Sequence, residues 1–173
     1  GRIPNDGFLL LASAPYDGEV AFADRELGRL LAGIERKGAL RDTLVLAMAD
    51  HGEGLGEHGE GTHGLFLYDS TLRVPLIVAG PGIAAGRVAT TVARGVDVLP
   101  TLLDLAGLPP RPELEGRSLR PAIDGRDMAD APLYAETIYP QREFGWAPLY
   151  AWRTATHKLV EAPRPELYDL SAD

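Results

Sequence analysis

Hydrophobic residues recur along the first part of the chain with the period of a helix. Between Glu19 and Lys37, apolar residues return at steps of three and four, and charged residues fall largely between them. This pattern is typical of an amphipathic helix. Pro15 breaks the preceding apolar run and Asp17 can cap the helix. Gly38 follows the last periodic residue, so we expect it to end the helix in the left-handed conformation.

Short apolar runs predict the strands of a sheet. One run covers Thr43–Ala49 and another covers Val74–Ala79, and both are closed by turn residues, as buried strands are. Because a helix leads directly into the first run, the order favours a parallel α/β sheet. Val88–Val92 predicts an edge strand, and Phe8–Ala12 predicts a strand or the end of one.

The second half of the chain predicts a helix, a connector and a small sheet. Asp97 caps a predicted helix over Val98–Ala106, and Gly107 lies just past its end. A connector without periodicity, Pro109–Asp130, follows. Short alternating segments then predict a small antiparallel sheet: Leu133–Thr137, Leu149–Thr154, His157–Glu161 and the stretch from Glu166 to Leu170.

These elements divide the chain into two predicted parts. Residues 1–130 form an α/β domain with a mixed or parallel sheet flanked by helices. Residues 131–173 form a small antiparallel β subdomain that packs on it. A chain of 173 residues can bury one sizeable core.

Candidate chemistry concentrates in the glycine-dense segment after the first predicted strand. Asp50 and His51 end that strand, and open α/β sheets bind ligands at the carboxyl ends of their strands. Because carboxylate oxygens and imidazole nitrogens bind divalent cations, both residues are candidate metal ligands. The alternative is a capping Asp beside a solvated His. The Gly-x-Gly-x-Gly spacing of residues 52–56 favours ligands, since it implies backbone held close to something.

The other ionisable groups of this segment have different expected roles. His63 is a candidate cation or proton donor to a substrate oxyanion, with an ordinary loop histidine as the alternative. Glu57 and His58 are candidates for orienting the first ligands. Glu53 and Glu60 are interpreted as solvated loop carboxylates.

Composition excludes several classes of function. With 17 basic and 25 acidic residues, the net charge of -8 argues against a nucleic-acid partner. The absence of cysteine excludes disulfides and thiolate zinc sites. No apolar run is long enough for a membrane segment. A periplasmic, extracellular or membrane-attached location stays open. An acidic protein that binds an anion needs local positive charge, and a bound metal ion supplies it.

Six motifs occur in a fixed order between residue 17 and the end of the chain. They are Asp50-His51-Gly52, Leu55-Gly56-Glu57-His58-Gly59, Arg73-Val74-Pro75-Leu76-Ile77, the run from Asp97 to Gly107, Gly116-Arg117-Ser118-Leu119 and Glu166-Leu167-Tyr168-Asp169-Leu170. In this order they resemble the second half of an arylsulfatase-like sulfatase of the alkaline phosphatase superfamily. The resemblance implies part of an alkaline-phosphatase-like α/β fold.

The resemblance also implies a metal site and an activity. In that family, an acid followed by Asn or His at this strand end completes a calcium site, a role that falls here to Asp50 and His51. Many members carry a lysine thirteen residues after the acid, where it contacts the sulfate group. This chain has His63 there, which can donate a hydrogen bond to a sulfate oxygen. The implied substrate is a small-molecule or carbohydrate sulfate ester.

One part of the family pattern is missing from these residues. Sulfatases attack sulfur with a formylglycine hydrate, which is made within a Cys/Ser-x-Pro-x-Arg motif. The chain has no cysteine, and its stretch Ser13-Ala14-Pro15-Tyr16-Asp17 lacks the arginine. We therefore expect the C-terminal portion of a sulfatase, inactive alone, whose partner is the N-terminal half of the same protein. The alternatives are a phosphodiesterase or phosphonate hydrolase of the same superfamily, or a non-catalytic domain that binds a partner near Trp146.

Overall fold

The computed structural model describes residues 14–172. The predicted strand Phe8–Ala12 and the residue Ser13 lie outside this part. The described residues divide into two compact units, one that ends at Thr43 and one that begins at Leu44. The predicted boundary at residue 130 falls within the second unit, and it stays a prediction.

The first unit contains the predicted amphipathic helix. Helix α2 (Pro15–Arg36) is followed by a 3-10 turn, η1 (Leu40–Asp42). Gly38 adopts the left-handed conformation after the helix, with a φ of 70°, as predicted. The predicted start is wrong. Pro15 occupies the first turn, where its missing N–H is not needed, and Asp17 lies inside the helix instead of capping it.

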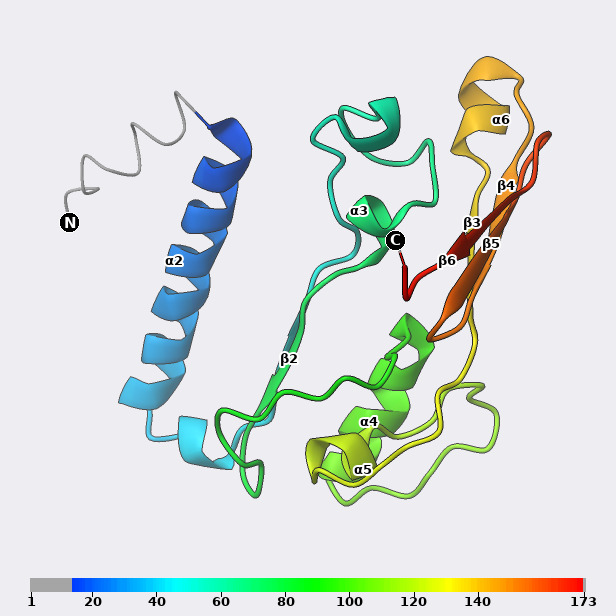
Figure 1. Ribbon diagram of the computed structural model, residues 1–173. Coiled ribbons are helices and arrows are strands. Elements are labelled where there is room, and N and C mark those ends of the chain that lie inside the picture. The colour runs from blue at the N-terminus through cyan, green and yellow to red at the C-terminus, as the bar shows by residue number, and fades with distance from the viewer. Residues whose placement is uncertain (1–13, 173) are drawn as a thin grey trace. The chain divides into compact units, whose positions relative to one another are not determined.

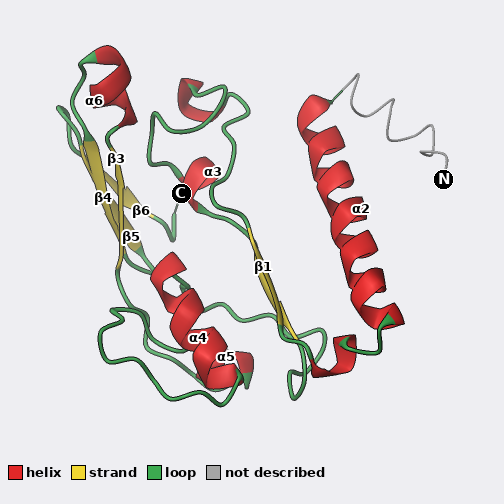
Figure 2. Cartoon of the chain, turned by 180° about the vertical axis from the view of Figure 1, so that it is seen from behind, coloured by secondary structure: helices red, strands yellow, loops and turns green. Residues whose placement is uncertain are grey.

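Strands β1 (Val45–Met48) and β2 (Leu76–Ala79) confirm the two predicted apolar runs, and Figure 2 shows them as a narrow ribbon. Their pairing is antiparallel, with Met48 opposite Leu76, whereas the helix-then-strand order favoured parallel strands. The reason is the connection. Residues 49–75 fold back beside the end of β1, and no crossover helix carries the chain to the opposite end.

The two strands are less buried than predicted. Met48 and Ile77 lie on opposite faces of the ribbon, because Met48 pairs with Leu76 and Ile77 with Ala47, and their exposed fractions are 43% and 63%. Each face of this two-stranded ribbon therefore carries an exposed apolar side chain. The apolar run therefore predicted the strands but not their burial in this chain.

The small antiparallel sheet is confirmed, with the four strands in sequential order (Figure 1). They are β3 (Leu133–Thr137), β4 (Leu149–Arg153), β5 (His157–Glu161) and β6 (Glu166–Asp169). One face of this sheet builds the core of the second unit: Leu149, Ala151 and Val160 pack with Leu67 from the segment after the glycine loop. The core thus ties the C-terminal sheet to the chain that leaves the candidate site.

Helix α4 (Val98–Leu105) confirms the predicted helix, with Gly107 in the left-handed conformation beyond its end. Asp97 does occupy the capping position, but its side chain does not bond to the helix N–H groups. It accepts hydrogen bonds from Arg94 and from the backbone N–H of Arg117. The predicted side-chain cap is therefore wrong, and Asp97 joins the connector to the start of α4.

Several short elements complete the second unit. They are the 3-10 turns η2 (Glu57–Gly59) and η3 (Gly95–Asp97) and the helices α3 (Asp69–Leu72), α5 (Arg120–Ile123) and α6 (Tyr139–Phe144). The predicted edge strand is wrong: residues 88–92 form a loop, and Val88 is 88% exposed. Within residues 14–172, no helix combines the length and the apolar character needed to cross a bilayer.

Candidate functional site

Asp50 and His51 leave the end of β1 as an exposed pair. The side chain of Asp50 is 90% exposed, and its Oδ1 accepts a hydrogen bond of 3.1 Å from the backbone N–H of His51. The Nε2 atom of His51 lies 3.6 Å from Oδ2 of Asp50. The other ring nitrogen, Nδ1, contacts the carbonyl oxygen of Gly52 at 2.8 Å. The carboxylate and the imidazole therefore lie together, and the carboxylate keeps open coordination positions.

The glycines after this pair are needed because other backbone lies against them. The N–H groups of alternate glycines donate to carbonyl oxygens at 2.7–2.9 Å: Gly52 to Thr71, Gly54 to Thr62 and Gly56 to Glu60. A Cβ atom on Gly52 would lie 2.1 Å from the carbonyl oxygen of Ser70, and one on Gly54 would lie 2.7 Å from that of Glu60. The predicted close approach is confirmed, and what approaches is the chain's own backbone.

This folding brings His63 to the Asp50–His51 pair. The rings of His51 and His63 stack with their centroids 3.9 Å apart and an interplanar angle of 27°. Nδ1 of His63 lies 3.0 Å from Oε2 of Glu53. Asp50, His51, Glu53 and His63 thus form one cluster, which we call the His51–His63 cluster.

Glu57 and His58 lie in separate contacts. Glu57 accepts a hydrogen bond of 2.7 Å from the N–H of Leu55, and backbone hydrogen bonds from Glu57 itself and Leu55 lower the pKa of the Glu57 carboxyl. The ring of His58 stacks on Tyr68 at 3.8 Å, and His58 has a φ of 54°. Across the described residues, neither side chain hydrogen-bonds to Asp50 or His51. Their predicted role in orienting the metal ligands stays a prediction.

The interpretation of Glu53 and Glu60 as solvated carboxylates is wrong. The side chain of Glu53 is 24% exposed and pairs with His63. Glu60 is only 1% exposed, and its Oε1 accepts hydrogen bonds from the N–H groups of Leu65 and Phe66. Neither contact follows a helical or strand period, so the spacing of residues along the chain carried no signal for them.

The cluster fits part of a metal site. The carboxylate of Asp50 and the imidazole of His51 suit a divalent cation, and Asp50 is free enough of other partners to bind one. In the part of the chain that is described, however, no group of three or more His, Asp or Glu side chains is arranged to hold a metal ion. Calcium takes six to eight oxygen ligands, so this chain offers only some of them.

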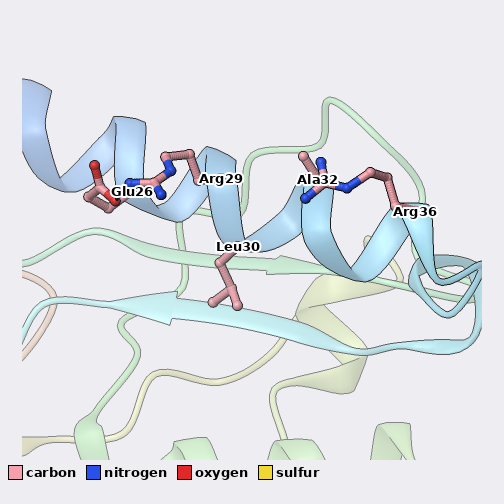
Figure 3. A pocket seen from close by; sticks show the side chains of 5 residues that line it. All are labelled: Glu26, Arg29, Leu30, Ala32 and Arg36. Atoms are coloured by element: carbon pink, nitrogen blue, oxygen red, sulfur yellow. Dashed lines mark hydrogen bonds and ion pairs between the residues drawn. The ribbon is translucent and has the colours of Figure 1, made fainter. Parts of the chain in front are cut away.

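Two hollows lie outside the cluster. A groove of about 400 Å³ in the second unit has an aromatic and aliphatic wall, which includes Phe66, Trp146 and Leu149. Trp146, near which the alternative of a non-catalytic domain places its partner, lines this groove. A hollow of about 470 Å³ on α2 is lined by Glu26, Arg29, Leu30, Ala32 and Arg36 (Figure 3). Arg29 pairs with Glu26 at 2.6 Å, as residues on a solvated helix face do.

Comparison with known proteins gives concordant matches. The family model described as Sulfatase matches residues 12–108. A choline-sulfatase of Rhizobium meliloti (strain 1021) is 39% identical over 163 residues, which cover 91% of this chain and 31% of that protein. The chain therefore spans about a third of the length of this curated relative.

Solved structures of two kinds share the fold. BT4656, solved in complex with its substrate D-glucosamine-2-N,6-O-disulfate, superposes with a TM-score of 0.79 at 32% identity, covering 90% of this chain and 33% of BT4656. A phosphonate monoester hydrolase of Agrobacterium radiobacter superposes with a TM-score of 0.75 at 30% identity, covering 91% of this chain and 34% of that one. The alkaline-phosphatase-like fold class expected from the sequence is confirmed.

Proposed function

This chain belongs to the sulfatase family, and we propose that it supplies part of the metal-dependent active site of a sulfate ester hydrolase. The observation that carries the proposal is the His51–His63 cluster. It unites an open carboxylate, two stacked imidazoles and a second carboxylate at the end of β1. This cluster lies within the residues that the family model matches.

In this proposal Asp50 and His51 are metal ligands, and the metal is calcium. A bound divalent cation supplies positive charge to the oxygens of an anionic ester. The open side of Asp50 is suited to that role, because within the described residues its carboxylate accepts only a backbone hydrogen bond and lies beside the imidazole of His51. Glu57 and His58 are proposed to support the loop that carries these ligands. A formylglycine nucleophile is expected in the complete enzyme, on residues other than these.

His63 is proposed to contact an oxygen of the ester as a hydrogen-bond donor. Its Nδ1 faces Glu53 at 3.0 Å, so a proton on Nδ1 is held by that carboxylate. The Nε2 atom is then the ring nitrogen left for a substrate oxygen when the ring is protonated on both sides. Stacking on His51 keeps the ring next to the proposed metal ligands. The chain thus offers a cation site and a donor to the same anion.

The substrate is proposed to be a sulfate ester, of a small molecule or a carbohydrate. The carbohydrate class is supported by BT4656, whose substrate is a sulfated glucosamine. The 173 residues alone are expected to bind calcium weakly and to turn over no ester, because they lack the Cys/Ser-x-Pro-x-Arg motif. The remaining part of the active site is assigned to the N-terminal half of the same protein.

Calcium titration by calorimetry tests the proposal. We expect weak binding that Asp50→Ala weakens roughly tenfold or more, as loss of a ligand does. Asp127→Ala is the matched control, since Asp127 is also an exposed aspartate and makes no hydrogen bond or ion pair in the described residues. Equal calcium affinities of the wild type and Asp50→Ala would contradict the metal-site proposal and favour a non-catalytic binding domain.

A turnover assay addresses the second half of the proposal. We expect the chain alone to leave an aryl sulfate unhydrolysed. A measurable rate that His63→Ala abolishes would contradict the assignment of the nucleophile to other residues, while supporting the role of His63.

A phosphonate ester hydrolase is the second candidate, because the fold also superposes on a phosphonate monoester hydrolase, with a TM-score of 0.75. Binding of phenyl sulfate and of phenylphosphonate, each in the presence of calcium, separates the two. Larger shifts of the His63 ring signals in NMR spectra with phenyl sulfate favour the sulfatase. Larger shifts with phenylphosphonate favour the second candidate.

A further inference from the structure

Glu60 is a buried carboxylate within the loop that carries His63. It is among the largest side chains of the described residues that are almost fully enclosed, at 1% exposure. Its Oε1 accepts hydrogen bonds of 2.8 Å from the N–H of Leu65 and 3.3 Å from the N–H of Phe66. Its Oε2 is buried and has no partner within the described chain. Burying a carboxylate whose Oε2 has no hydrogen-bond partner is unfavourable by itself. The hydrogen bonds that Oε1 accepts must therefore offset this cost.

That role is to close the segment 60–66 into a fixed turn. The carboxylate of Glu60 reaches forward to the two N–H groups that follow Gly64, and those groups would otherwise face inward without acceptors. In the sequence, His63 lies between Glu60 and the residues that supply these N–H groups, so His63 is part of the turn.

Other contacts hold the same segment from the outside. The N–H of Gly54 donates to the carbonyl oxygen of Thr62 at 2.7 Å, and the hydroxyl of Thr137 donates to that of Gly64 at 2.6 Å. Both neighbours of His63 are therefore bonded, and the inner side of the turn depends on Glu60. Glycine at position 54 also leaves room for the Glu60 side chain, because Cγ of Glu60 lies 3.2 Å from where a Cβ on Gly54 would stand.

We propose that Glu60 is a positioning residue: its buried carboxylate fixes the turn 60–66 and so holds His63 against Glu53 and His51. What matters is the acceptor at Oε1, not the charge, because the bonded partners are neutral N–H groups. Loss of the acceptor leaves two part-buried donors without a partner, which the turn can satisfy by opening to water. The His63 ring then leaves its stack. The functional meaning of this arrangement rests on the proposed role of His63, but the geometry does not.

NMR of the imidazole side chains tests the proposal without substrate, metal or turnover. At a single fixed pH, the wild type is expected to show nuclear Overhauser contacts between the ring protons of His51 and His63, as their 3.9 Å stacking requires. It is also expected to show the Nδ1 signal of a hydrogen-bonded His63. We expect Glu60→Ala to lose both signatures and Glu60→Gln, which keeps a carbonyl acceptor, to retain them.

The matched control is Glu161→Ala, which removes an exposed carboxylate from β5 in the same unit. Its histidine signals are expected to equal those of the wild type. Retention of both signatures in Glu60→Ala would overturn the proposal. If Glu60→Ala unfolds the second unit, Glu60→Gln decides: intact His51–His63 contacts support the acceptor role, and lost contacts overturn it. None of these outcomes depends on whether the protein hydrolyses sulfate esters.

Discussion

Two aspartates of the second unit, each predicted at the end of a regular element, have opposite environments. Asp50 follows β1 with its side chain 90% exposed, and it accepts one backbone hydrogen bond, from His51. Asp97 precedes α4 with its side chain fully enclosed. It accepts bonds from the backbone and guanidinium of Arg94 and from the N–H of Arg117.

The difference distinguishes Asp50, whose carboxylate can bind a ligand, from Asp97, whose carboxylate only stabilises the fold. Burial by itself raises the pKa of Asp97, but the hydrogen bonds from the Arg94 side chain and from the backbone N–H groups of Arg117 and Arg94 outweigh it and lower that pKa. All the acceptor capacity of Asp97 is used within the protein. Asp50 keeps most of its capacity for a ligand, at little benefit to stability.

The strongest test of this contrast is Asp97→Ala. The substitution leaves the Arg94 guanidinium and the Arg117 N–H without their acceptor, so we expect it to lower the free energy of unfolding by roughly 3 kcal/mol. This is the low end for a broken buried ion pair, because Arg94 retains 20% exposure. Urea denaturation measures the change, with Asp127→Ala as the exposed control expected to stay within about 0.5 kcal/mol. Equal midpoints for both variants would break the contrast.

Asp69→Ala has the next largest expected effect. Asp69 holds Lys158, whose side chain is only 3% exposed, at 2.9 Å, and Arg153 at 3.2 Å. Removing the carboxylate leaves a buried ammonium group without its counter-charge. We therefore expect the free energy of unfolding, measured by urea denaturation, to fall by about 2 kcal/mol. The double variant Asp69→Ala/Lys158→Met is expected to be more stable than Asp69→Ala alone, because it removes the uncompensated charge as well. A double variant less stable than both single variants contradicts this account.

The pH dependence of stability should show the same two carboxylates. Burial tends to raise the pKa of Asp69, but its hydrogen bond to Lys158 and the nearby charges of Lys158 and Arg153 lower it overall from the ordinary 3.8. Because the folded pKa values of Asp69 and Asp97 are lowered, the unfolded chain binds more protons in acid, and their stabilisation is lost as the pH falls below about 4. Asp97→Asn cannot titrate, so its stability should fall less steeply there. Parallel urea-midpoint curves for Asp97→Asn and the wild type would count against this assignment.

The smallest expected effect on stability belongs to Asp50→Ala. Its side chain is 90% exposed and accepts one hydrogen bond, so its removal should change the free energy of unfolding by less than about 0.5 kcal/mol. The same variant is expected to lose calcium affinity, as described above. A loss of stability comparable to that of Asp97→Ala would show that Asp50 is structural and would remove the basis for the metal site.

Local sequence patterns predicted much of the fold because they reflect short-range physics. The helical period of α4 and the glycine beyond it involve residues that are close together in the chain. The same holds for the alternation within each of the four C-terminal strands. Helix α6 (Tyr139–Phe144) was missed because its six residues are too few to establish a period. Val88–Val92 had the composition of a strand, but it pairs with no strand among residues 14–172 and forms a loop.

The sequence by itself determined the identity and order of the chemical groups: an acid and a histidine at a strand end, a glycine-dense loop and another histidine thirteen residues after the acid. Tertiary structure alone decided the antiparallel pairing of β1 with β2, the contact of Glu53 with His63 and the burial of Glu60. The physical reason is distance along the chain. Period and propensity act over a few residues, whereas these contacts depend on how residues 49–75 fold back on themselves, and no local pattern encodes that path.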